Sequence, residues 1–197
     1  MAAVGALAQD ALPFVGGPTL NIYNTRTLEV LARQGMTRWV LPLELSGATA
    51  AELIAAAPEE CPCEVFAWGR LPLAWSARCY TARAEDRPKD RCDLACIADP
   101  DGRLMRTRED QPFLVLNGIQ TQSALTQDLA PHIGALRAAG VAVLRLSPQS
   151  RGMADVVRRF DAVRRDEADP ETFAALAALA PVGTCAGYWR GEAGFAP

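Results

Sequence analysis

Short apolar runs alternate with helical patterns along this chain. Buried strands are predicted by apolar runs at residues 12–15, 37–41, 113–117 and 141–146, and residues 64–74 are predicted to form a strand followed by a turn. Helices are predicted by start and stop signals around 25–34, 47–57, 128–139, the later part of 147–165, and 171–179. This alternation predicts an α/β fold with a parallel sheet.

The cap, the buried face and the end of the first of these helices can all be predicted from its sequence. We expect Thr25 to cap it, Leu28, Val30 and Leu31 to face the core, and Gly35 to end it.

The connections are predicted with less regular structure. A turn is expected at Gly16-Gly17-Pro18, and the residues after it are expected to form a short extended piece that ends at Asn21 or Asn24. The polar stretch 118–127 is expected to be a link, and the Gly-rich tail from 183 to be irregular.

Polar residues recur where the predicted strands end, and parallel α/β folds bind ligands at that edge. The candidates for a substrate pocket are Asn21, Asn24, Glu44, Arg70 and Asn117, with Arg145 at the end of the last strand. The simpler interpretation of each is that it caps a helix or orders a loop.

Composition narrows the class of protein. Of 197 residues, 50% are hydrophobic, so the chain can bury a core, and we expect one domain over 1–197. The net charge of −3 argues against a nucleic-acid-binding protein, because its surface as a whole has no excess of positive charge. No apolar run is long enough for a transmembrane helix, and no basic leader precedes an apolar segment, so we expect a cytoplasmic protein.

Three of the six cysteines lie in a charged segment, residues 77–101, hereafter the cysteine segment. Cys79, Cys92 and Cys96 follow a C-x12-C-x3-C spacing. Thiols in polar surroundings favour metal ligation over core packing, and the wide intervals favour an iron–sulfur cluster over a zinc ribbon. Basic residues around them would offset the negative charge of a thiolate-bound cluster: Arg78, Arg83, Arg87, Lys89 and Arg91. The simpler interpretation is a solvated loop with incidental cysteines.

Several stretches resemble the peptidase U32 family, and within it the members that serve ubiquinone biosynthesis. The resemblance rests on SARCYTAR, CDLAC, DPDG and FLVLNGIQTQS, with PFVGGPTLNIYN, PLELS and GYWRGEAG in support. It implies a TIM-barrel-like fold. Because a whole barrel needs about 250 residues, we expect a partial barrel that lacks its N-terminal strands, with the cysteine segment inserted after a barrel strand.

The resemblance also implies that Cys79, Cys92 and Cys96 are ligands of a 4Fe–4S cluster, with zinc as the alternative. The family's fourth cysteine lies ahead of anything that matches this sequence. The fourth ligand is therefore missing with an upstream part of the protein, replaced by Cys61, Cys63 or Cys185, or supplied by a non-protein group.

By the same resemblance, the chain would act with a UbiU-like partner, as a heterodimer, in oxygen-independent hydroxylation of an aromatic ubiquinone precursor. Two alternatives stay open: RNA hydroxylation, as in other U32 proteins, and a structural metal-binding module without catalysis. Proteolysis is not expected, because the sequence has no Ser/His/Asp or HExxH arrangement. The single histidine, His132, is expected at the surface near a helix start.

Overall fold

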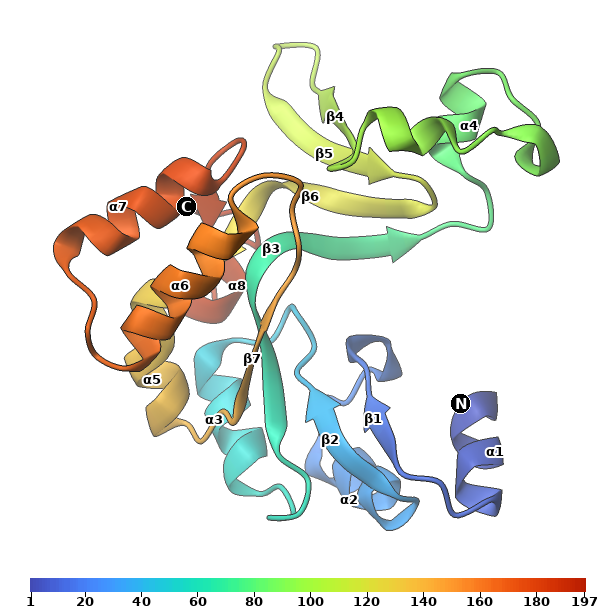
Figure 1. Ribbon diagram of the computed structural model, residues 1–197. Coiled ribbons are helices and arrows are strands. Elements are labelled where there is room, and N and C mark those ends of the chain that lie inside the picture. Colours follow the sequence, from blue (N-terminus) through green and yellow to red (C-terminus); the bar gives the residue numbers. More distant parts are fainter. The chain divides into compact units, whose positions relative to one another are not determined.

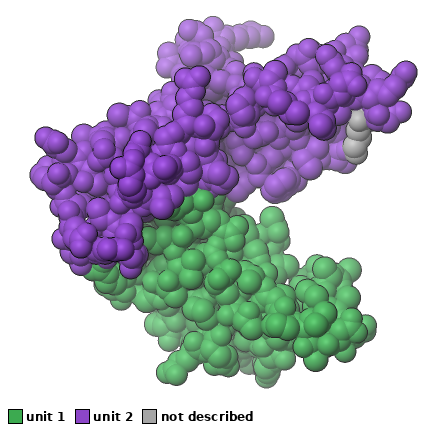
Figure 2. Space-filling view, viewed as in Figure 1, with its two compact units in different colours: residues 1–67, 129–146, 186–196 green, residues 68–128, 147–185, 197 purple. Residues whose placement is uncertain are grey.

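The computed structural model describes residues 1–197, except for the side chain of Lys89. The chain forms two compact units, and each is built from segments that are distant in sequence (Figure 2). The first contains Met1–Ala67, Leu129–Leu146 and Ala186–Ala196, and the second contains Trp68–Asp128, Ser147–Cys185 and Pro197. Both combine helices with strands, so the chain is a mixed α/β protein.

The first unit is organised around parallel strand pairs (Figure 1). Strand β1 (Phe14–Gly16) pairs in parallel with β2 (Met36–Val40), and β2 pairs in parallel with the start of β3 (Cys63–Trp75). Strand β7 (Val143–Leu146) pairs with β3. The helical elements of this unit are α1 (Ala2–Gln9), η1 (Pro18–Leu20), α2 (Thr25–Arg33), α3 (Gly47–Ala55), η4 (Ala130–His132), α5 (Ile133–Ala138) and α8 (Gly187–Arg190).

Helix α2 confirms the predicted position and corrects its details. Leu28 and Leu31 are buried as expected, but Val30 is 43% exposed. The cap is Asn24, whose side chain accepts a hydrogen bond of 2.8 Å from the Thr27 amide, and Thr25 is the first helical residue. An Asn at this position satisfies one of the amide donors that a helix start leaves unpaired.

The second unit is dominated by antiparallel strands. The distal part of β3 pairs with β6 (Gln120–Asp128), β6 with β5 (Pro112–Asn117), and β5 with β4 (Arg103–Arg106), all antiparallel. Strand β8 (Thr184–Cys185) adds a parallel pair to β6. The helical elements are α4 (Tyr80–Ala84), η2 (Lys89–Arg91), η3 (Ala95–Ala98), α6 (Met153–Arg164) and α7 (Pro170–Leu179).

The expected α/β class is confirmed, but the expectation of a parallel, partly TIM-barrel-like sheet is wrong. The strand order of the described residues is β1-β2-β3-β6-β5-β4, with β7 and β8 paired off this path to β3 and β6, so the eight-stranded sheet is mixed and open. The antiparallel half arises because β3 continues for 13 residues and is followed by two hairpin connections. A parallel sheet would need a crossover between successive strands, and residues 103–128 contain none.

The polar stretch 118–127 is the main error in the predicted elements, because most of it is strand β6. Four of its five buried positions are polar, with Ala124 the exception, so the sequence shows no apolar alternation that would predict a strand here. The Ser123 hydroxyl accepts a 2.8 Å bond from the Leu71 amide and donates a 2.6 Å bond to the Leu125 carbonyl. Such bonds make a buried hydroxyl tolerable.

Three further expectations are corrected by the structure. Arg70 lies inside the continuous strand β3 rather than at a strand end. Residues 18–20 form a 3-10 turn instead of an extended piece, and the tail contains β8 and α8. The predicted helix over 128–139 begins later, at Ile133, after η4.

Packing of α6 against β3 supports the second unit. The rings of Trp68 and Phe160 meet edge to face, with centroids 6.0 Å apart and planes at 74°. Both side chains are buried, and a pair of this kind adds about 0.5–1.5 kcal/mol beyond its buried area. Among the described helices, none combines the length and the apolar character needed to cross a bilayer.

Candidate functional site

The cysteine segment lies in the second unit and is built from short helical pieces. Cys79 caps α4, where its Sγ accepts a hydrogen bond of 3.5 Å from the Ala82 amide. Cys92 ends the 3-10 turn η2, and Cys96 lies within η3. The segment therefore places each of the three thiols at or near the end of a different short element.

All three thiols are unpaired and half-buried, so each is reachable from solvent. Thiol donors of this kind are the ligands that iron–sulfur clusters and zinc prefer. In the described part of the chain, however, no three His, Cys, Asp or Glu side chains are gathered so that they could hold one metal ion. The donor set fits a thiolate-bound group in its chemistry, while its side chains are not assembled into a ligand cage.

Positive charge surrounds Cys79. The Cys79 side chain lines a surface hollow together with Arg78, Arg83 and Arg87. Arg87 also donates a 3.4 Å hydrogen bond to the Cys92 carbonyl and pairs with Asp93 at 3.1 Å. Guanidinium groups in this position favour a bound anion or an anionic cluster. The side chain of Lys89, one of the basic residues expected here, lies outside the described residues.

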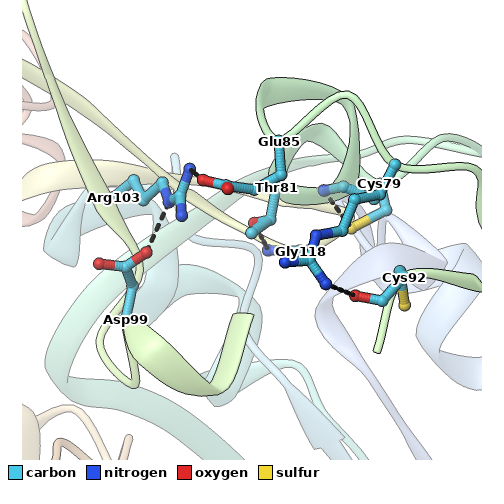
Figure 3. A network of polar contacts seen from close by, with 9 residues as sticks. Cys79, Thr81, Glu85, Cys92, Asp99, Arg103 and Gly118 are labelled. Carbon is cyan, nitrogen blue, oxygen red and sulfur yellow. Dashed lines mark hydrogen bonds and ion pairs between the residues drawn. The ribbon is translucent and has the colours of Figure 1, made fainter. Parts of the chain in front are cut away.

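An ion-pair network braces the cysteine segment (Figure 3). The guanidinium of Arg103 on β4 lies between two carboxylates, with Nε 2.5 Å from Asp99 and Nη1 2.6 Å from Glu85. Hydrogen bonds to Asp99 and then Glu85 raise the pKa of Arg103 above its ordinary value. Thr81 on α4 accepts a 3.3 Å bond from the Gly118 amide in the β5–β6 turn. Both ends of the segment are thereby tied to the antiparallel strands.

Sequence reasoning missed Arg103. Its position could have indicated the ion pair, because Arg103 lies four residues after Asp99 and directly follows the Asp-Pro-Asp-Gly turn.

The other cysteines are deeply buried. Cys61 and Cys63 belong to the first unit, and each is 1% exposed. Burial raises the pKa of Cys63 to about 12, with smaller contributions from the charges of Glu64 and Cys61. Burial also raises the pKa of Cys61, and the charge of Glu60 adds to this effect. Cys185 is buried in β8 of the second unit. Burial disfavours the thiolate that ligation requires, so these thiols are less suited to ligation than the three in the cysteine segment.

The pocket candidates of the first unit are Asn21, Asn24 and Glu44, which lie in loops and at the ends of helical elements. Asn24 caps α2, and Asn21 adopts a left-handed conformation, with φ 55°, at the end of η1. Glu44 accepts a hydrogen bond from the Tyr23 hydroxyl. This bond, then burial and the Glu44 charge, raise the pKa of Tyr23 to about 12.

Arg70 and Asn117, the remaining two candidates, line one cavity of the second unit. Its volume is small, about 60 Å³. The residues around it are Gly69, Arg70, Pro100, Asp101, Asn117, Gln122, Thr126, Ser147, Pro148, Gln149 and Pro181. The structure thus brings together two residues that are 47 positions apart in the sequence.

A buried carboxylate with two arginines was not anticipated as a unit. Glu64 at the start of β3 pairs with Arg38 of β2 and Arg145 of β7, all within the first unit. Arg145, one of the polar residues predicted at a strand end, is therefore an ion-pair partner. His132 is half-buried rather than at the surface, and burial, then Arg190, lower its pKa.

The fold and site define an α/β protein with an open mixed sheet and a cysteine-bearing segment attached to its antiparallel half. The chain matches Peptidase family U32 over residues 3–188 and belongs to that family. No solved structure matches it.

Proposed function

We propose that this chain is an iron–sulfur subunit in which Cys79, Cys92 and Cys96 hold a 4Fe–4S cluster. In this proposal it acts with a UbiU-like partner in oxygen-independent hydroxylation of an aromatic ubiquinone precursor. The support beyond family membership is the similarity of its cysteine segment to that of the ubiquinone-biosynthesis protein UbiV. A cluster of this type supplies one-electron chemistry.

The observation that carries the proposal is the contrast among the six thiols. Three are half-exposed, unpaired and concentrated in one segment with basic neighbours, whereas the other three are buried. Each thiol loses one proton and binds metal as the thiolate, and nearby arginines favour that negative charge. Arg78, Arg83 and Arg87 would balance the charge of the occupied site, and Arg103 would position the segment through Glu85 and Asp99.

The first experiment is cluster reconstitution under strict anaerobic conditions with Fe²⁺ and sulfide. We expect broad absorption near 400 nm, about four irons and four sulfides per chain, and loss of both in Cys92→Ser. Leu94→Ser is the matched control, because it places the same side chain at an exposed position between Cys92 and Cys96. A chain that takes up zinc alone under these conditions would favour the structural metal-binding module.

The fourth ligand is tested by single replacements of Cys61, Cys63 and Cys185 with Ala. If one of them is a ligand, its loss lowers the iron content as Cys92→Ser does. If all three leave it unchanged, the fourth ligand lies outside the described chain or is not a protein group.

The partner and substrate are tested by co-expression with a UbiU-like protein under anaerobic conditions. We expect co-purification and hydroxylated ubiquinone precursor that disappears when Cys92→Ser replaces the wild-type chain. Salt-sensitive co-purification of RNA, with hydroxylated RNA as the product, would favour the RNA alternative instead.

A further inference from the structure

Arg70 is held in the cavity of the second unit by few contacts. Its Nη1 donates to the backbone carbonyl of Asp101, and among the described residues this is the only hydrogen bond of the guanidinium. The Nε atom is fully buried and has no partner there. In an arginine, Nε and Nη2 form one edge with two parallel donors, so an entire edge of Arg70 is uncommitted.

This arrangement is costly unless something occupies that edge. A buried donor without a partner costs about 1–3 kcal/mol, and more when it is charged. Burial withdraws the Arg70 guanidinium partly from water and lowers its pKa, while the Asp101 charge opposes this effect. An anion with two oxygen acceptors would supply both the missing bonds and the missing counter-charge.

The other polar groups of the cavity differ in what they can still bind. The Asp101 carboxylate accepts from the Ser150 amide at 2.7 Å and from its hydroxyl. Gln149 accepts from the Trp68 indole at 3.1 Å and donates to the carbonyls of Arg151 and Leu179. Within the described residues, no hydrogen bond holds the side-chain amide of Asn117, so this donor is available beside Arg70.

We infer that this cavity binds a small molecule through an oxyanion, a carboxylate or a phosphate, which accepts from the Nε and Nη2 edge of Arg70 with the Asn117 amide nearby. The cavity volume of about 60 Å³ accommodates the oxyanion group of such a molecule and is below that of a site that encloses a whole drug-sized ligand. Asp101 is the only acidic side chain among the lining residues, and its oxygens are turned to Ser150. The inference does not depend on the proposed iron–sulfur function, because the cysteines do not line this cavity.

The test is titration of the full chain with acetate, malonate, inorganic phosphate and sulfate at constant ionic strength, with chloride as the reference salt. The readout is the ¹H–¹⁵N signal of the Arg70 side-chain Nε–H, assigned by its absence in Arg70→Lys. We expect a saturable shift with one class of anion, and the class that saturates first distinguishes carboxylate from phosphate ligands. In Arg70→Gln the affinity, followed by calorimetry, should fall by about tenfold or more.

Arg106→Gln is the matched control. It makes the same change in charge within the second unit, at an exposed β4 position that does not line the cavity. Asn117→Leu keeps the Arg70 charge and should weaken binding to a smaller extent, which protects the test if Arg70→Gln impairs folding. Failure of all four anions to shift the Nε–H signal, or equal affinity in Arg70→Gln and Arg106→Gln, would overturn the inference.

Discussion

The Nε of Arg38 lies 2.9 Å from the Oε2 of Glu64, and the Glu64 side chain is only 4% exposed. Its second oxygen pairs with Arg145. One carboxylate at the start of β3 therefore joins β2 and β7 on either side of it in the first unit. Loss of the Glu64 charge would therefore leave both arginines without their shared counter-charge.

Glu64→Gln should destabilise the chain. Removal of a buried partner costs about 3–5 kcal/mol when the remaining charge stays buried. Arg38 and Arg145 are roughly 40% exposed and can be hydrated, so we expect a smaller loss, about 1–3 kcal/mol. Urea unfolding followed by circular dichroism measures it, with Glu52→Gln on the exposed face of α3 as the control. A difference between the two variants below about 0.5 kcal/mol would show that the group contributes little.

The six thiols should divide into two classes of reactivity. In metal-free, reduced protein at pH 8, iodoacetamide should modify Cys79, Cys92 and Cys96 within minutes and leave Cys61, Cys63 and Cys185 unmodified. Since the pKa of Cys63 is about 12, its thiolate fraction at that pH is on the order of 10⁻⁴. Mass spectrometry of tryptic peptides measures which of the six cysteines are modified. Rapid modification of Cys63 in the folded chain would contradict the burial on which the thiol contrast depends.

Arg103→Gln should loosen the cysteine segment without unfolding the second unit. The substitution removes the ion pairs to Glu85 and Asp99, so amide exchange over residues 80–98 should accelerate several-fold, while β5 and β6 stay protected. Hydrogen–deuterium exchange with mass spectrometry measures this. Arg106→Gln, on the same strand, is the control because its partner Asp110 lies in the β4–β5 turn. Equal exchange over residues 80–98 in the two variants would mean that the Arg103 network does not hold the segment.

Stability should decline at high pH through Tyr23. Its folded pKa is about 12, against an ordinary value of 10.0. A raised folded pKa means that the unfolded chain loses this proton first, so the contribution is complete below pH 10 and disappears as the pH rises toward 12. The effect is small because Tyr23 is 42% exposed and solvent screens its interaction with Glu44. Unfolding midpoints between pH 9 and 12 should fall more steeply in wild type than in Tyr23→Phe. Parallel curves would show that the Tyr23–Glu44 bond does not persist in solution.

Helices were predicted well where local signals decide them. The helices at 47–57 and 171–179 were placed close to α3 and α7, because Ser46 and Asp169 cap them through their own side chains. Strand β6 was missed for the opposite reason, since Ser123, Thr126 and Gln127 are buried polar residues whose tolerance depends on partners elsewhere in the fold. Arg70 was expected at the C-terminal side of a strand within residues 64–74, whereas β3 continues through it to Trp75.

By itself, the sequence determined the α/β composition, most helices, the family and the concentration of three cysteines in one polar segment. These properties follow from local patterns of polarity, capping residues and spacing along the chain. Only the tertiary structure decided that the sheet is open and mixed, that Glu64 joins Arg38 and Arg145, and that Arg70 and Asn117 share a cavity. The physical reason is that strand direction, ion pairing and cavity lining are set by hydrogen bonds and contacts between residues far apart in sequence.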